Sequence, residues 1–111
     1  MQTDQTTARI RSLNDTLRTT LLGGKIMMTQ GVSVLGPDRL SRLIERLRTF
    51  DQFEEGNDPY GEHDFGAFDQ DGQTYFWKIE YYDPSLSYHS EDASDPEKTA
   101  RVLTIMRADE Y

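Results

Sequence analysis

The spacing of the apolar residues changes near residue 50 from a helical to a strand period, and this change limits the folds open to the chain. Between residues 10 and 21, apolar side chains recur at intervals of three or four, which is typical of one face of a helix. Between residues 75 and 81, large side chains occupy every second position, which is typical of a strand with one buried face. Helices followed by strands predict an α+β domain.

The first half of the chain predicts two helices and a short strand. We expect a first helix over about residues 7–22, a strand over residues 25–29, and a second helix that begins at residues 36–38. The second helix would turn its apolar side inward and its arginines outward. Those arginines are Arg39, Arg42, Arg46 and Arg48.

The second half predicts a hairpin and a final strand, separated by loops. The expected segments are a loop over 51–64, a hairpin over 65–82 that turns at Asp71-Gly72, a loop over 83–98, and a strand over 101–106. The sequence therefore predicts one domain over residues 1–111. Its fold should be a small, mostly antiparallel sheet of three or four strands, with two helices packed on one face.

Charge is also divided between the two halves. Residues 1–50 carry eight Lys or Arg and four Asp or Glu, whereas residues 51–100 carry two Lys and fourteen Asp or Glu. An acidic block of this density repels nucleic acid and membrane phosphates and attracts basic proteins. We therefore expect no direct binding to nucleic acid or membranes, and a protein partner with a basic, nucleic-acid-binding surface. The outward arginines could contact nucleic acid, but the preferred expectation is that they pair with the acidic loops of the same chain or of a second copy, which leaves a homodimer open.

The chain contains no cysteine, so it can form neither a disulfide nor a Cys-based metal site. Residues 1–5 are polar and no long apolar run follows them, which predicts neither a signal peptide nor a membrane-spanning helix. We expect a cytoplasmic protein without a bound metal or cofactor.

Sequence blocks spread over most of the chain are distinctive. They are residues 10–15, 23–24, 29–32, 57–66 (NDPYGEHDFG), 77–83 (WKIEYYD), 95–96, 101–106 (RVLTIM) and 110–111. Together they resemble the signature of a small bacterial family known only as a domain of unknown function and often found on plasmids and other mobile elements. The departures from that signature are Glu80, where Asp is common, and residues 90–92, where a Pro is common. The resemblance implies an intact fold and a mobile-element setting, but no mechanism.

Carboxylates and tyrosines of the second half are the candidate partner-binding residues. Their carboxylates would imitate the charge of a nucleic-acid backbone and block the groove of a DNA- or RNA-binding protein, while the tyrosines would pack against it. The candidates are Asp58, Tyr60, Glu62, Asp64, Asp69, Asp71, Tyr82, Asp92 and Asp95. With the mobile-element setting, they predict a non-enzymatic anti-defence inhibitor of a CRISPR effector or restriction enzyme. Solubility alone is the competing explanation for the charge.

A small hydrolase with its site in residues 57–65 is the alternative function. His63 would act as the general base, and Asp58, Glu62 and Asp64 would orient it or hold a metal. Adjacent residues of an extended chain point to opposite sides, so at most Glu62 and Asp64 converge without His63, or His63 converges with a residue elsewhere. In the competing structural interpretation, the acids cap turns and His63 anchors the loop. His63 and His89 do not follow a recognised metal-binding spacing.

Overall fold

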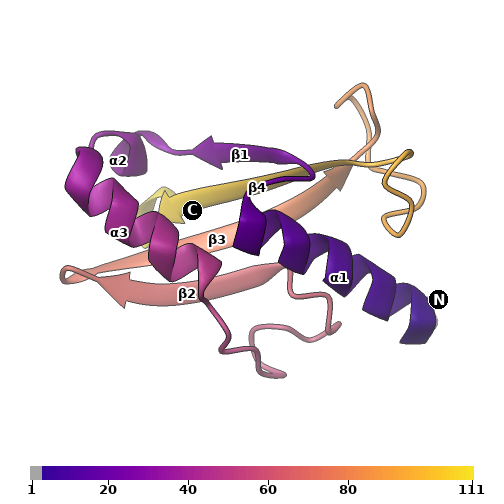
Figure 1. Cartoon of the computed structure of the whole chain (residues 1–111), viewed down its shortest axis with the longest axis horizontal. Helices are drawn as coiled ribbons and strands as arrows, with labels where there is room; N and C mark the ends of the chain where they lie inside the picture. The colour runs from indigo at the N-terminus through magenta and orange to yellow at the C-terminus, as the bar shows by residue number, and fades with distance from the viewer. Residues whose placement is uncertain (1–3) are drawn as a thin grey trace.

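The computed structural model describes residues 4–111 and consists of three α-helices, a four-stranded sheet and a short C-terminal 3-10 helix (Figure 1). In chain order the elements are α1 (Asp4–Thr20), β1 (Lys25–Met28), α2 (Gln30–Ser33), α3 (Pro37–Arg48), β2 (Phe65–Gln70), β3 (Gln73–Tyr82), β4 (Ala100–Arg107) and η1 (Ala108–Glu110).

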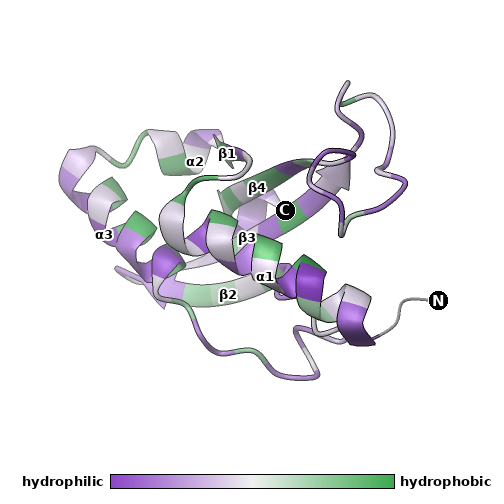
Figure 2. Ribbon diagram, turned by 45° about the vertical axis from the view of Figure 1, so that its right-hand side comes forward, coloured by the Kyte–Doolittle hydropathy of each residue, from purple (hydrophilic) through white to green (hydrophobic). Residues whose placement is uncertain are grey.

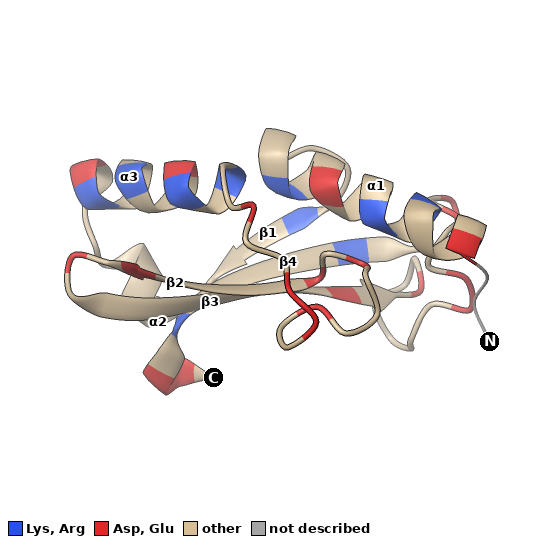
Figure 3. Ribbon diagram, turned by 90° about the horizontal axis from the view of Figure 1, so that it is seen from below, with Lys and Arg blue, Asp and Glu red and all other residues tan. Residues whose placement is uncertain are grey.

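The strands form one sheet in the order β1-β4-β3-β2. β3 pairs antiparallel with β2 and with β4, whereas β1 pairs parallel with β4. α1 and α3 lie on the same face of the sheet (Figure 3). The predicted α+β fold, with a mostly antiparallel sheet and two helices on one face, is confirmed. The sequence analysis missed α2, because four residues are too few to show a helical period.

The core lies between the sheet and the two long helices. Trp77 in β3 and Leu103 in β4 are fully buried, as are Leu17 of α1 and Leu43 and Leu47 of α3. The alternation predicted for β3 is confirmed, because Tyr75, Trp77 and Ile79 are buried and the residues between them are only partly covered. In Figure 2 apolar residues gather on the helices and strands, whereas the two long loops are mainly hydrophilic.

The outward arginines of α3 contact side chains of the same chain. Arg39 and Arg42 lie 3.8 and 3.2 Å from the carboxylate of Asp71, at the turn between β2 and β3. Arg46 lies over the ring of Phe68 at 5.0 Å. Two of these arginines thus pair with an acid of the same chain, but that acid lies in the hairpin turn and not in the long acidic loops that were expected.

Arg18 is a buried cation that joins α1 to the end of α3, and the sequence analysis did not single it out. Its side chain is 5% exposed. The Nη1 atom donates to the carbonyl oxygens of Leu47, Arg48 and Phe50 at 3.2, 3.2 and 2.8 Å. Because the last carbonyls of a helix lack partners within it and carry partial negative charge, a cation at this position stabilises the helix end. The guanidinium also lies 5.5 Å from the ring centre of Trp77.

Within residues 4–111, no helix has the length and apolar character needed to cross a membrane. The predicted lack of a signal peptide depends in part on residues 1–3, which lie outside the described residues.

Replacing Arg18 should destabilise the fold strongly. Arg18→Met keeps the apolar stem but leaves the carbonyls at the end of α3 without their donor, so we expect the free energy of unfolding to fall by about 3 kcal/mol. Arg39→Met is the matched control, because Arg39 is 55% exposed in its ion pair and should change stability by about 0.5 kcal/mol or less. Urea denaturation of both variants measures this difference, and equal losses would contradict the role given to Arg18.

Gly66 in β2 lies directly against the indole of Trp77. A Cβ atom at residue 66 would lie 2.3 Å from Trp77 Nε1 and 2.8 Å from the ring of Phe50, both within the core. We therefore expect Gly66→Ala to lower the free energy of unfolding by about 2 kcal/mol through overpacking. Gly56→Ala is the control, since nothing lies within 4 Å of a Cβ there. Thermal unfolding that gave the same midpoint for both variants would contradict the tight contact.

Candidate functional site

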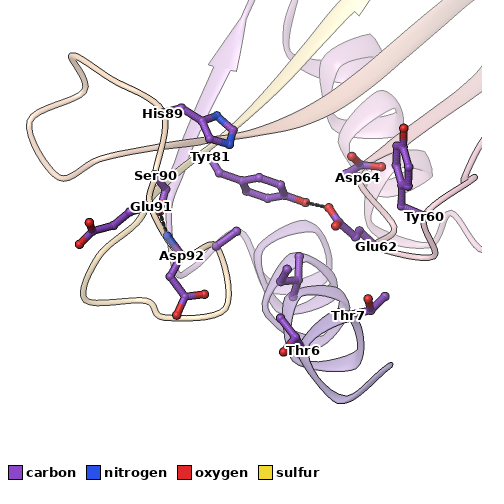
Figure 4. Close-up of a pocket in the computed structure, with 12 residues that line it drawn as sticks. Thr6, Thr7, Tyr60, Glu62, Asp64, Tyr81, His89, Ser90, Glu91 and Asp92 are labelled. Atoms are coloured by element: carbon purple, nitrogen blue, oxygen red, sulfur yellow. Dashed lines mark hydrogen bonds between the residues drawn. The ribbon is translucent and has the colours of Figure 1, made fainter. Parts of the chain in front are cut away.

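A cavity of about 860 Å³ opens between α1, the loop over residues 57–64 and the loop over residues 83–99 (Figure 4). Four of its lining side chains are carboxylic acids, and none of the described residues that line it is Lys or Arg. The acids are Glu62, Asp64, Glu91 and Asp92. The remaining polar and aromatic lining comes from Thr6 and Thr7 of α1, from Tyr60, and from Tyr81, His89 and Ser90.

The loop before β2 turns alternate residues into the cavity. Tyr60, Glu62 and Asp64 line it, whereas His63 does not. The prediction that Glu62 and Asp64 converge without His63 is therefore confirmed. The backbone reaches this arrangement through positive φ angles of 70° at Gly61 and 55° at His63. The His63 amide donates to Asp58 Oδ1 at 3.0 Å, which stabilises the bend.

Hydrogen bonds at the cavity floor fix the carboxylate of Glu62. Tyr81 donates its hydroxyl proton to Glu62 Oε1 at 2.7 Å, and Asn14 Nδ2 donates to the Tyr81 hydroxyl at 2.8 Å. Asn14 also donates to the Glu62 carbonyl at 3.0 Å and accepts from Arg101 Nε at 2.8 Å. Burial, and then the bond to Glu62, raise the pKa of Tyr81 far above its usual value, so the phenol remains a donor.

Asp64 lies in an environment that disfavours its charge. Its pKa is raised from 3.8, first by burial and then by repulsion from Glu62, with a smaller contribution from Asp58. No Lys or Arg is among the described residues that line the cavity, although the pKa of Asp92 is lowered by hydrogen bonds and, to a smaller extent, by Lys98 and Arg9, which lie outside the lining. The charge of Arg101 interacts with Glu62, and its Nε donates to Asn14.

His63 is a structural anchor of the loop. Its Nδ1 lies 2.8 Å from Asp15 Oδ1, and its Nε2 lies 3.7 Å from Asp58 Oδ2. Its ring stacks on Phe53, with 3.6 Å between ring centres and 5° between planes. The structural interpretation of His63 is supported, and its imidazole does not join the two acids that line the cavity.

The nine candidate partner-binding residues do not form one surface. Tyr60, Glu62, Asp64 and Asp92 line the cavity, whereas Asp69 and Asp71 lie at the tip of the β2–β3 hairpin. Figure 3 shows acidic residues at several separate places around the sheet.

Five of the nine are held by burial or by contacts within the chain. Asp58 is only 6% exposed in its side chain, and Asp71 pairs with Arg39 and Arg42. Asp69 accepts from Thr74 Oγ1 at 2.6 Å, and Asp92 accepts from Ser94 Oγ at 2.6 Å. Asp95 accepts from the Glu97 amide at 2.9 Å. Tyr82 lies on β3 next to Tyr81, on the side that faces away from the core.

Tyr81, His89 and Glu91 are cavity residues that the sequence analysis did not choose as candidates for the site. Tyr81 shares a face with Trp77, yet its hydroxyl bonds Glu62 at the cavity floor. His89 and Glu91 lie in the loop over 83–99, and no local pattern indicates which way they point. The bridge between Tyr82 and His89 brings that loop back toward β3.

Among residues 4–111, no group of three or more His, Cys, Asp or Glu is arranged to hold a metal ion. His89 lines the cavity and His63 does not, so the two histidines do not form a shared site there.

Comparison with known proteins places the chain in a family. Residues 28–110 match the family model described as "Protein of unknown function (DUF3768)", and this match includes the distinctive blocks over 57–66, 77–83 and 101–106. No curated protein and no solved structure matches the chain significantly. α1, which supplies one wall of the cavity, precedes the matched residues. The match covers well over half of the sequence, and the chain therefore belongs to the DUF3768 family of proteins of unknown function.

Proposed function

We propose that the protein binds a cationic segment of a partner protein in the cavity between α1 and the loops over 57–64 and 83–99. The observation that carries this proposal is the lining of that cavity, which holds four carboxylic acids and two tyrosines but no Lys or Arg among its described residues. A cavity of about 860 Å³ is large enough for several side chains of a partner.

Electrostatics favours a cation as the occupant. Asp64 is partly buried and repelled by Glu62, so a positive charge placed between them would relieve both effects. Lys98 lies 3.9 Å from Glu91, but both side chains are exposed, and such a pair contributes little. The negative potential therefore remains available to a ligand.

The tyrosines favour arginine over lysine. Tyr60 is 75% exposed and stands at the cavity rim next to Asp64, and the ring of Tyr81 forms part of the floor (Figure 4). A guanidinium group can stack on an aromatic face and bond a carboxylate with two parallel hydrogen bonds, whereas an ammonium group presents a single point charge.

The partner class follows from where arginines are concentrated. Proteins that bind nucleic acid contact phosphates largely through Arg and Lys. A protein that occupies such arginines competes with the nucleic acid, and the proposed role is therefore inhibition of a nucleic-acid-binding protein. An anti-defence inhibitor of a CRISPR effector or restriction enzyme is the narrower form of this proposal, and it also rests on the mobile-element setting that the sequence resemblance implies.

A hydrolase that uses the same cavity is the second candidate. It is favoured by one observation, namely that Glu62 and Asp64 share the cavity while only Glu62 is fixed by a tyrosine hydroxyl. Two carboxyl groups in different environments can divide the roles of acid and base. Asp64→Glu separates the two candidates, because it keeps the charge needed for binding but displaces the carboxyl group, which would reduce turnover by about 100-fold.

Neutralising the cavity should weaken binding of a cationic probe. We expect Asp64→Asn/Glu91→Gln to reduce the affinity for a short oligo-arginine peptide by about tenfold or more, because two carboxylates at the site are lost. Isothermal titration calorimetry measures the affinity, which should also fall steeply with added salt.

Asp51→Asn/Glu55→Gln is the matched control for this experiment. It removes the same net charge from two exposed residues that do not line the cavity, and it should change the affinity by about twofold or less. Equal weakening by both double variants would show that the net charge of the protein, and not the cavity, attracts the peptide. In the complex with a captured partner, added duplex DNA or RNA should displace the protein.

The ionised carboxylate of Asp64 should lower the free energy of unfolding when no partner is bound. A carboxyl group whose pKa is raised on folding contributes fully to stability below its unfolded pKa, and that contribution is lost as the pH rises through the folded pKa. We therefore expect Asp64→Asn to be more stable than the wild type at pH 7, and the difference to disappear as the pH falls toward 3.8. Urea denaturation over this pH range tests the prediction, with Asp51→Asn as an exposed control. A destabilised Asp64→Asn at pH 7 would show that favourable contacts hold the carboxylate in place.

A further inference from the structure

We propose that two copies of the chain associate through their β1 strands, which pair antiparallel about a two-fold axis at Met27 and form one continuous eight-stranded sheet. This surface is separate from the acidic cavity and does not depend on its proposed function.

β1 is an open edge of the sheet. It pairs only with β4 and stands first in the strand order, and in Figure 1 no other element lies beyond it. The Thr29 amide donates to the Ile105 carbonyl at 3.2 Å. Because a parallel ladder alternates every second residue, Lys25 and Met27 also direct their backbone groups toward β4. Ile26 and Met28 therefore direct theirs away from it.

These outward groups are self-complementary. In an antiparallel pair centred on Met27, Ile26 of each copy faces Met28 of the other, and the two residues exchange both backbone hydrogen bonds. Met27 then faces its own counterpart in the closer, non-hydrogen-bonded type of pair. A two-fold arrangement of this kind satisfies the same surface on both copies.

The side chains around β1 favour contact over solvation. Met27 and Met28 are 52% and 42% exposed, and Leu22 and Val34, which flank the strand in sequence, are each 70% exposed. These four are half of the large apolar side chains that are exposed within residues 4–111. Exposed apolar side chains on an open edge strand, here Met27 and Met28, mark a site of association.

The distribution of acidic residues favours association through β1 over association through β2, the other edge strand. Residues 16–37 contain no Asp or Glu, although the chain has twenty of these residues and a net charge of −8. Two copies therefore meet least repulsion at β1. The opposite edge, β2, ends at Asp69 and the Asp71 turn and follows the acidic loop over 51–64.

The same pairing brings opposite charges together. Lys25 faces Thr29 of the partner subunit, and in each copy the Thr29 hydroxyl donates to Glu110 Oε1 at 2.6 Å. Glu110 is exposed, and its pKa is lowered by bonds from Thr29, Arg107 and Gly31, so it is ionised at neutral pH. Within the described residues Lys25 forms no ion pair. The dimer would supply two equivalent pairs, Lys25 with Glu110 of the partner subunit, on either side of the axis.

Cysteine cross-linking tests this geometry, because the chain has no cysteine of its own. In the proposed pair, the Cα atoms at residue 27 lie about 4.5 Å apart, within the range of a disulfide. Those at residue 28 lie about 8 Å apart, beyond that range. Met27→Cys should therefore oxidise to a covalent dimer at least about tenfold faster than Met28→Cys, a matched substitution on the same strand.

Sedimentation equilibrium of the full chain gives the second measurement. The wild type should sediment at twice the chain mass of 12.8 kDa, and Met27→Asp, which opposes two carboxylates at the axis, should sediment as a monomer. Leu86→Asp, at a 45% exposed position in the loop over 83–99, should remain dimeric. A monomeric wild type, a dimeric Met27→Asp, or equal cross-linking of the two cysteine variants would each overturn the proposal.

Discussion

The arrangement of the cavity depends on one fully buried amide, the side chain of Asn14. Its Nδ2 donates to the Glu62 carbonyl in the loop over 57–64 and to the Tyr81 hydroxyl on β3, and its Oδ1 accepts from Arg101 on β4. An amide is suited to this position because it carries two donor hydrogens and an acceptor on one short side chain. All of them are used here, so a side chain of only one polar kind would leave a buried group without a partner. Asn14 therefore joins α1 to the sheet and positions Glu62 and Tyr81 at the cavity floor.

Buried arginines at two places support the same layer of helices. Arg18 holds the carbonyl end of α3, and Arg101 is 3% exposed and lies with its charged carbon 5.2 Å from the ring centre of Tyr81. Burying a guanidinium is costly unless its hydrogens find acceptors. Backbone carbonyls, Asp15 and Asn14 supply acceptors, although the buried Nε of Arg18 has no hydrogen-bond partner among the described residues, and aromatic rings lie over both guanidinium groups. The two helices are consequently positioned by directional contacts as well as by the apolar core.

Most of the fold could be predicted from the sequence, because period and turn chemistry are local. The helical spacing over 10–21, the strand alternation over 75–81 and the Asp71-Gly72 turn each identify an element without knowledge of the rest of the chain. The site could be predicted only in part. The alternation of Glu62 and Asp64 is local and was predicted, whereas the contact of Asp71 with α3 and the bridge between His89 and Tyr82 depend on the tertiary fold. The net charge predicted an acidic binding surface, but only the tertiary contacts show that Asp71 is already paired and Asp58 is buried.

The position of α1 has a consequence for how the binding properties of this scaffold can diverge. β2, β3, β4 and α3 lie within the residues that match the family model, as does Met28 at the end of β1, whereas the wall contributed by Thr6, Thr7 and Ile10 belongs to a helix that precedes them. Substitutions on that wall reshape the mouth of the cavity without altering any pair of strands. The outer side chains of α1 can therefore vary while its buried face, with Asn14, Leu17 and Arg18, keeps the contacts that hold the fold.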